Sequence, residues 1–296
     1  MPEIAKPAVE FQVGAGVQSD VRFDAESVVE PLPSMLPEGR HFRGERKVRL
    51  GDVGQAGRLR FDALTRYTQD VSDDDTTDAG LPENPGWVVR STVVDQLSAA
   101  SLGERLSFTT FCSGLGKRWA ERRLSIHGDR GAHYEVATIW VCVDPVTGQP
   151  HALTDEFLQL YGAAAGGRKV SARLKNPRLA DQEPTGVSVA DWQLRAADYD
   201  VYGHVNNAAY WALLEQWTPE SVLANPLRAR LEYGAGLAPA DSVLTARTLS
   251  HSGLQLWWLE SGEHAANGTA GRSPSELLQG GSVASVLMTP LAVSPY

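Results

Sequence analysis

The apolar residues of this chain gather in short runs that are rich in β-branched and aromatic side chains. Each run is bounded by glycine, aspartate or proline, a pattern typical of β-strands. In the first half the runs lie at 87–94, 105–113, 118–127 and 133–143. In the second half they lie at 228–233, 242–249, 255–260 and 282–291. The pattern therefore predicts strands in both halves.

Each half also contains one segment in which the apolar residues recur at helical spacing. The first predicted helix carries Phe61, Leu64, Thr68 and Val71 on one side, and the second carries Tyr210, Leu213, Leu214 and Trp217. We expect the first helix to end at 72–75, where consecutive aspartates indicate a solvated loop.

The order of turn, helix and strands occurs twice, which indicates an internal duplication. The turns before the helices can be superposed by spacing, with Asp52 opposite Asp198 and Gly57 opposite Gly203. The halves differ at two other positions, where Gly54 stands opposite Asp200 and Arg58 opposite His204. Only the second half therefore has a titratable carboxylate and imidazole in its turn.

The duplication divides the chain into four parts. We expect a flexible arm at 1–44, a non-catalytic, pocket-forming domain at 45–161, a linker at 162–190 and a catalytic domain at 191–296.

The segment from Asp198 to Tyr210 carries the candidate chemistry. Gly203 marks a turn, and Asn206 is a natural N-cap for the helix that follows. The turn places Asp200 and His204 beside the amides at the start of the helix. Such amides can hold a carbonyl oxygen while a neighbouring base directs water at the carbon.

Composition limits the class of protein. The formal charge of −9 and the pI near 5.3 argue against a broad basic surface for nucleic acid. Cys112 and Cys142 are too few for a disulfide framework or a cysteine-rich zinc site. We expect neither cofactor nor metal. The opening residues lack the pattern of a signal peptide and no apolar run is long enough to span a bilayer, so we expect a cytoplasmic protein.

A basic run stands out in the acidic chain, within the expected linker. It contains Arg168, Lys169, Arg173 and Lys175. This run could be a docking surface for acyl carrier protein (ACP) or for the phosphates of coenzyme A, or it could be an ordinary solvated linker.

The string at 198–207, followed by Tyr210, resembles the acyl-ACP thioesterases of plants and bacteria. Shorter similar segments lie at 87–90, 113–118, 138–141 and 241–244. Members of this family consist of two hotdog domains, each a long helix wrapped by an antiparallel sheet. The resemblance covers most of 45–292 and implies an α+β tandem hotdog fold and a thioesterase that acts on acyl-ACP or acyl-CoA.

Two departures limit what the resemblance carries over. Plant members have an asparagine two residues before the motif histidine, where this chain has Tyr202. They also have an acidic residue, and often a cysteine, after a segment like 231–233, where this chain continues with Gly234. The remaining pattern resembles single-domain hotdog thioesterases, in which an aspartate at the position of Asp200 works with helix amides.

The resemblance implies that Asp200 directs water at the thioester or attacks it, and that His204 assists. The expected substrate-binding residues are Tyr202, Val205, Asn206, Asn207 and Tyr210. The competing interpretation is structural, with Asp200 as a helix cap and His204 as a core histidine. Glu215 and Glu232 are expected to face solvent.

Two other functions fit the same pattern. A hotdog dehydratase acting on hydroxyacyl thioesters would also use a histidine, and a non-catalytic acyl-thioester sensor would need no second polar cluster. Because tandem hotdog domains pair within one chain, either a monomer or a homodimer is compatible with the sequence.

Overall fold

The computed structural model describes residues 32–35, 39–81, 86–181, 187–234, 237, 243–250, 253–259 and 282–291. Within these ranges a single antiparallel sheet of ten strands runs through both halves in the order β1-β3-β4-β5-β2-β7-β10-β9-β8-β6. No helix in the described ranges has the length and apolar character needed to cross a membrane.

Each half contributes five strands to this sheet. The first half provides β1 (His41–Lys47), β2 (Gly86–Ser98), β3 (Arg105–Leu115), β4 (Trp119–Gly128) and β5 (His133–Val143). The second half provides β6 (Ser188–Trp192), β7 (Leu227–Tyr233), β8 (Val243–Ser250), β9 (Gly253–Leu259) and β10 (Ser282–Pro290). The halves join where β2 pairs with β7, and the buried ion pair of Asp95 and Arg228 crosses this junction.

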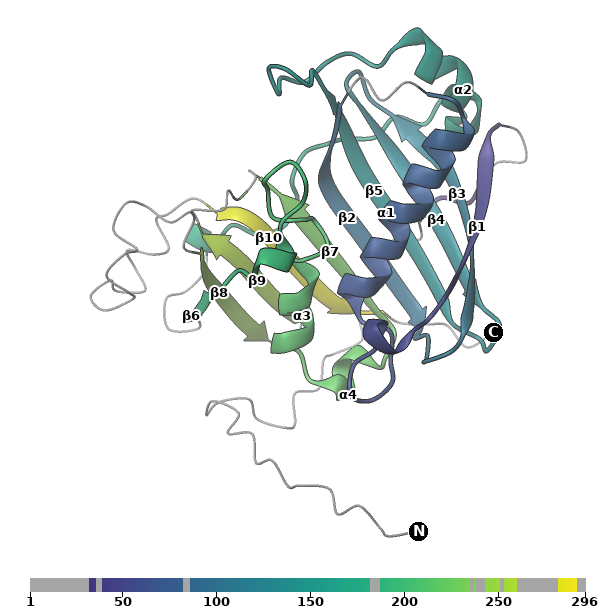
Figure 1. The fold of residues 1–296 in the computed structure, drawn as a ribbon. Coiled ribbons are helices and arrows are strands. Elements are labelled where there is room, and N and C mark those ends of the chain that lie inside the picture. Colours follow the sequence, from purple (N-terminus) through teal and green to yellow (C-terminus); the bar gives the residue numbers. More distant parts are fainter. Residues whose placement is uncertain are drawn as a thin grey trace.

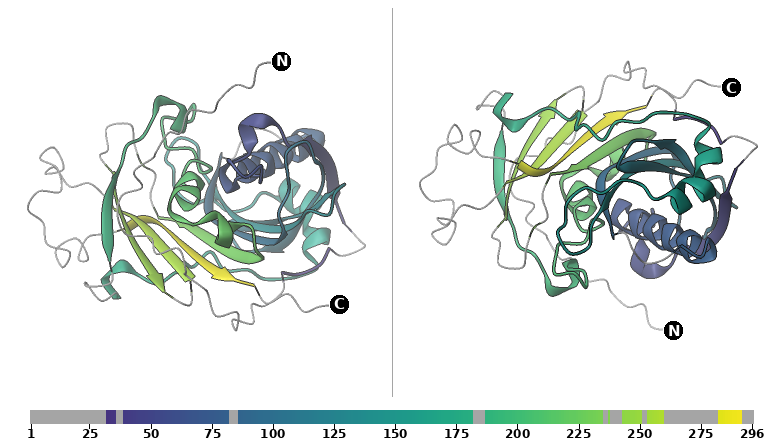
Figure 2. Two further views of the ribbon diagram at one scale, coloured as in Figure 1. Left: turned by 90° about the horizontal axis from the view of Figure 1, so that it is seen from below. Right: turned by 90° about the horizontal axis from the view of Figure 1, so that it is seen from above.

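The helices are α1 (Phe61–Asp78), α2 (Asp155–Ala165), α3 (Trp211–Trp217) and α4 (Glu220–Leu223), and short 3-10 turns, η1 (Leu50–Asp52) and η4 (Ala196–Asp198), lie ahead of α1 and α3. Helix α1 lies across the strands of the first half, and α3 lies on the same face in the second half (Figure 1). The sheet curves around both helices (Figure 2). One hydrophobic core therefore extends from α1 to α3 and includes Phe61, Val94, Trp211 and Leu231.

The opposite face of the sheet is covered by other segments. In the first half α2 packs Phe157 and Tyr161 against Cys112 and Cys142. In the second half the linker residue Leu179 packs with Ala246, Trp257 and Leu259. Strand residues are therefore buried on both faces, which explains the nearly continuous apolar runs in the sequence.

The acidic segment 72–75 is helical, and the expectation of a solvated loop is wrong. Asp75 is 1% exposed, and its carboxylate accepts hydrogen bonds from Arg40, Arg122 and the hydroxyl of Tyr161. These partners come from outside the helix. Their positions could not be read from a local run of aspartates, which by itself suggests hydration.

The element boundaries differ from the expected divisions at three places. Strand β1 begins at His41, inside the segment expected to be a flexible arm. Helix α2 continues to Ala165, past the expected start of the linker, and β6 begins at Ser188, before its expected end. Strand β1 pairs with β3, and helix α2 packs on β3. These contacts account for the first two differences, because β3 is distant in sequence from both elements.

Candidate active site

The turn that carries the motif occurs twice in the structure with the same backbone hydrogen bonds. Asp200 N–H donates to His204 O at 2.8 Å, and Gly54 N–H donates to Arg58 O at 2.9 Å. The isolated bridge of Tyr199 with Val205 likewise repeats the bridge of Val53 with Leu59. The overlay made from spacing alone therefore pairs residues that are structurally equivalent.

An aspartate and a glycine hold each turn. Asp198 accepts the N–H of Arg195 at 2.8 Å, and Asp52 accepts the N–H of Arg49 at 2.7 Å. Gly203 has a φ of 76° and Gly57 has a φ of 78°, in the left-handed region that favours glycine. Asp198 and Asp52 thus fix the two turns in the same way.

Asp200 is bonded within its own turn through one oxygen. Its Oδ1 accepts the N–H of Tyr202 at 2.9 Å and that of His204 at 3.1 Å. Its Oδ2 has no donor among the described residues. The His204 side chain is exposed, which differs from the alternative of a core histidine. The carboxylate is thus held in place while one of its oxygens stays available to an incoming group.

Of the three amides expected to hold a carbonyl, two are already engaged. Val205 N–H donates to Leu237 O at 3.0 Å, and Asn206 N–H donates to Asp198 O at 2.8 Å. Asn206 also caps the following segment, since its Oδ1 accepts the N–H of Ala208 at 2.8 Å. The Asn207 N–H has no acceptor among the described residues. It is the amide that a ligand could use.

A cavity lies beside Asn207, between the two halves. The space between its lining residues is about 290 Å³, a volume that includes open solvent. Its lining comprises Thr65, Thr68, Gln69 and Ser72 of α1, Val89 and Thr92 of β2, Thr138 and Trp140 of β5, and Asn207, Trp211 and Tyr233 of the second half. Helix α1 therefore forms one wall of a cavity that reaches the motif of the other half.

A hydrogen-bond chain fixes Asn207 at the edge of the cavity. Trp211 Nε1 donates to the Tyr233 hydroxyl at 3.2 Å, and this hydroxyl donates to Asn207 O at 2.9 Å. Burial raises the pKa of Tyr233 far above its ordinary value, so the hydroxyl remains a donor at neutral pH. The backbone at Asn207 is thus anchored independently of Asp200.

The other expected substrate-binding side chains do not line this cavity. Val205 and Tyr210 are buried in the core, where Tyr210 packs against Tyr233 and Trp258. Tyr202 is 83% exposed. The sequence did not single out Gln69 or Tyr233, although the equal spacing of the two halves places Gln69 opposite Glu215.

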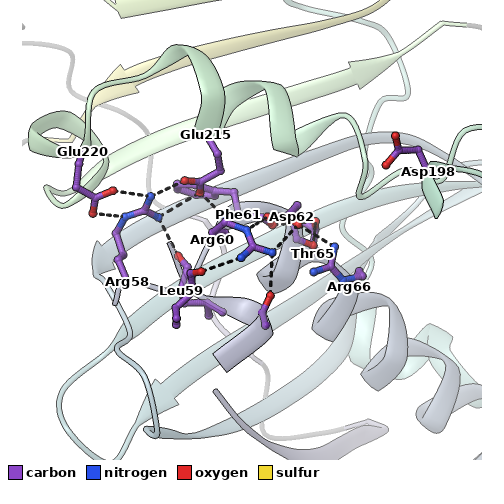
Figure 3. Close-up of polar contacts among 12 residues, drawn as sticks. Arg58, Leu59, Arg60, Phe61, Asp62, Thr65, Arg66, Asp198, Glu215 and Glu220 are labelled. Atoms are coloured by element: carbon purple, nitrogen blue, oxygen red, sulfur yellow. Dashed lines mark hydrogen bonds and ion pairs between the residues drawn. The ribbon is translucent and has the colours of Figure 1, made fainter. Parts of the chain in front are cut away.

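Glu215 of α3 reaches the start of α1 in the first half (Figure 3). Its Oε1 accepts the N–H of Phe61 at 2.7 Å, and its carboxylate pairs with the buried Arg58. Arg58 also binds Glu220, with 2.8 Å between Nε and Oε1. The prediction that Glu215 faces solvent is wrong, because Arg58 lies far away in sequence and draws Glu215 into the interface between the halves.

Glu232 is also buried, contrary to expectation. Its carboxylate accepts the N–H of Lys175 at 2.7 Å and that of Asn176 at 2.9 Å, so it fastens the linker to β7. The basic linker residues Lys169, Arg173 and Lys175 are exposed. Arg168 is partly buried and donates to the carbonyl oxygens of Ser113 and Ala164.

Three potential metal ligands gather at the hairpin of β4 and β5, away from the cavity lining. The ligand atoms of His127, His133 and Glu135 lie within 4.8 Å of one another. Glu135 is already bonded to Arg123 and Ser125. The cluster is therefore accounted for by contacts within the hairpin.

Comparison with known proteins relates both halves to one family. Residues 39–161 match the acyl-ACP thioesterase N-terminal domain, and residues 182–268 match the acyl-ACP thioesterase C-terminal domain. An uncharacterized protein of Mycobacterium tuberculosis is 31% identical over 204 residues, which are 68% of this chain and 79% of that protein.

Solved structures share the fold. The 12:0-ACP thioesterase of Umbellularia californica superposes with a TM-score of 0.65 at 17% identity, over 85% of this chain and 97% of its own. An acyl-ACP thioesterase of Bacteroides thetaiotaomicron gives 0.62 at 15% identity, over 84% and 97%. The expected tandem hotdog fold is confirmed, although the second half has the 7-residue α3 where the first half has the 18-residue α1.

Proposed function

The chain belongs to the acyl-ACP thioesterase family, and from this premise we propose that it hydrolyses acyl thioesters at the cavity beside Asn207. The observation that carries this proposal is that Asn207 lines the cavity and that its N–H has no acceptor among the described residues. A thioester carbonyl oxygen would accept this hydrogen bond. The first half would act as the wall of the acyl pocket, because α1, β2 and β5 supply most of the lining.

The reaction consists of attack and expulsion. The oxygen of a water molecule attacks the thioester carbon, and the carbonyl π electrons move to oxygen, where Asn207 N–H stabilises the developing charge. The C–S bond then breaks, and the thiolate leaves with the electron pair and takes up a proton. The products are a carboxylic acid and a thiol.

Asp200 is proposed as the group that directs the water. Its Oδ1 is held by two turn amides, and its Oδ2 is free to accept a proton from water or to attack the carbon itself. The exposed His204 is proposed to assist the departure of the thiolate by donating a proton to it.

The test compares Asp200→Asn with Asp200→Ala in a thiol-release assay on acyl-ACP and acyl-CoA of several chain lengths. Asparagine retains an oxygen acceptor for the two turn amides but loses the carboxylate, whereas alanine loses both. We expect both variants to lose about 100-fold or more in kcat. Asp200→Asn should melt near the wild-type temperature, and Asp200→Ala should lose about 1 kcal/mol of stability.

Two outcomes would contradict the proposal. If Asp200→Asn keeps its activity and only Asp200→Ala loses it, Asp200 has a structural role alone. If the wild type converts a hydroxyacyl thioester to an enoyl thioester without releasing thiol, the reaction is dehydration rather than hydrolysis.

ACP is the proposed carrier. The chain has a net charge of −9, yet Lys169, Arg173 and Lys175 form an exposed basic run. Arg90 donates to Ala172 O at 3.4 Å and to Tyr233 O at 2.7 Å, which brings the linker close to the cavity-lining end of β7. An acidic carrier protein docked there would be attracted by these charges.

Reversal of the three linker charges should raise KM for acyl-ACP in a salt-dependent way. It should leave KM unchanged for an acyl N-acetylcysteamine thioester, which has no phosphate. An equal effect on both substrates would remove the linker from carrier recognition.

A further inference from the structure

Helix α1 presents four polar side chains to the cavity, but three of them are satisfied within the helix. Thr65 donates to Phe61 O at 2.9 Å, Thr68 to Thr65 O at 2.8 Å and Ser72 to Thr68 O at 2.6 Å. Gln69 is different, because its carboxamide has no partner among the described residues. A carboxamide with both donor and acceptor groups is thus available at the cavity.

The duplication explains why Gln69 lies there. Phe61, the first residue of α1, and Asn207, in the turn before α3, are equivalent positions, and Gln69 and Glu215 are equivalent residues further along. In the first half the Glu215 side chain reaches across the interface and accepts the N–H of Phe61 at 2.7 Å (Figure 3). At the equivalent place beside the second half's turn, Gln69 of α1 and Asn207 line one cavity.

The surroundings of Phe61 and of Asn207 therefore differ in the hydrogen-bonding groups that they offer. In the first, the carboxylate of Glu215 is itself the acceptor for the helix amide, so the position of a substrate oxygen is filled by the protein. In the second, a carboxamide replaces the carboxylate. It supplies N–H donors and carries no negative charge to repel an oxyanion.

We propose that Gln69 is a catalytic residue that donates a hydrogen bond from Nε2 to the thioester carbonyl oxygen, beside the N–H of Asn207. This inference rests on the proposed hydrolysis. Two donors directed at one oxygen stabilise the charge that forms when water attacks the carbon, more than they stabilise the ground-state carbonyl. The two halves thus build the oxyanion site jointly, with one donor from each.

The experiment measures steady-state thiol release by Gln69→Ala and Gln69→Met. Methionine keeps the length and most of the volume of glutamine but has no N–H donor. Both variants should lose about 100- to 1,000-fold in kcat, with KM changed only a few-fold. Gln216→Ala, which removes an exposed glutamine from α3, should behave like the wild type.

Gln69→Glu provides a readout that packing alone would not change. Its carboxylate should accept the Asn207 N–H as Glu215 accepts that of Phe61, so the variant should be inactive at pH 7 with a melting temperature equal to or above that of the wild type. Protonation restores an O–H donor. The activity of this variant relative to the wild type should therefore rise as the pH falls toward 5.

The possible failures are distinguishable. If Gln69→Met keeps the wild-type kcat while Asp200→Asn is inactive, the role of Gln69 is overturned and the hydrolysis stands. If Gln69→Met loses activity only through a large rise in KM, Gln69 binds substrate and does not stabilise the transition state. If the wild type releases no thiol from any acyl thioester, both proposals fail.

Discussion

The carboxylate of Glu215 on α3 accepts the backbone N–H of Phe61, the first residue of α1, at 2.7 Å. This contact joins the two halves and satisfies the N–H at the first of two equivalent positions. The second, at Asn207, faces a cavity and has no acceptor among the described residues. In the duplicated structure one of the two equivalent N–H groups is thus bonded to a protein carboxylate, and the other is available to a ligand.

Loss of the Glu215 carboxylate should destabilise the interface between the halves. Glu215→Ala leaves Phe61 N–H without its acceptor and leaves the buried Arg58 with Glu220 alone. Removal of one partner from a buried ion pair costs about 3–5 kcal/mol, and the remaining Glu220 should keep the loss near the lower value. Denaturant unfolding measures this loss of stability. The more exposed Glu220→Ala should cost less, and an equal loss would contradict this ranking of the two contacts.

The two turn glycines offer a matched pair. Gly203→Ala and Gly57→Ala each place a side chain at a φ near +77°, where an L residue is strained by about 1–2 kcal/mol. Both variants should lose similar stability in thermal unfolding. Only Gly203→Ala should lose thiol-release activity, because its turn holds Asp200. Equal losses of activity in both variants would indicate that the effect arises from general destabilisation.

Tyr233→Phe should uncouple Asn207 from its anchor. The change removes the hydroxyl that accepts from Trp211 and donates to Asn207 O, while the ring packing against Tyr210 remains. We expect a loss of about 1–2 kcal/mol in stability and a fall in kcat larger than the change in KM. Unfolding curves and steady-state kinetics measure both. An unchanged kcat would show that the hydroxyl does not position Asn207.

Asp75 should be among the most sensitive acidic residues of the first half. Asp75→Ala leaves the guanidinium groups of Arg40 and Arg122 without the carboxylate between them and removes the acceptor of the Tyr161 hydroxyl. We expect a loss of about 3 kcal/mol or more in denaturant unfolding. Asp73→Ala, at an exposed site two residues earlier on α1, is the control and should change stability by less than about 0.5 kcal/mol.

Acid should weaken the start of α1 through Asp62. Burial by itself would raise the pKa of Asp62, but hydrogen bonds and positive charge from Arg60 and Arg66 outweigh it and hold the pKa below its ordinary value. Asp62 therefore binds its proton more tightly in the unfolded chain than in the folded protein. The stabilisation is therefore complete above about pH 4, the ordinary aspartate pKa, and is lost as the pH falls through the lower folded-state value.

Unfolding free energies of the wild type and Asp62→Asn, measured from pH 6 to pH 3, test this contribution. The wild type should be more stable at pH 6, and the difference should shrink as the pH falls. A difference that stays constant with pH would show that Asp62 does not titrate with folding.

The local parts of the candidate site were predictable from sequence. Gly203 permits the turn and Asn206 caps the segment after it through contacts within a few residues, so residue type and spacing were enough to predict their roles. The duplication was also visible, because equivalent positions keep the same spacing along the chain. Which backbone amides remain available to a ligand was harder to predict, because the N–H of Val205 donates to Leu237, which is distant in sequence.

The sequence alone thus determined most of the strands, helices α1 and α3, the duplicated turn and the family, because these depend on local patterns of side chains. It did not reveal β1 or α2, whose contacts with β3 are distant in sequence. Tertiary structure alone decided which carboxylates are buried and which polar groups reach the cavity. Asp75, Glu215 and Glu232 resemble surface residues by their neighbours in sequence, yet each is buried by partners from another element. Gln69 and Asn207 line one cavity only because the two halves pack helix to helix about a shared sheet. Whether a charged group is buried, or a donor is left without an acceptor, depends on the residues next to it in space. Those neighbours are set when segments distant in sequence pack together.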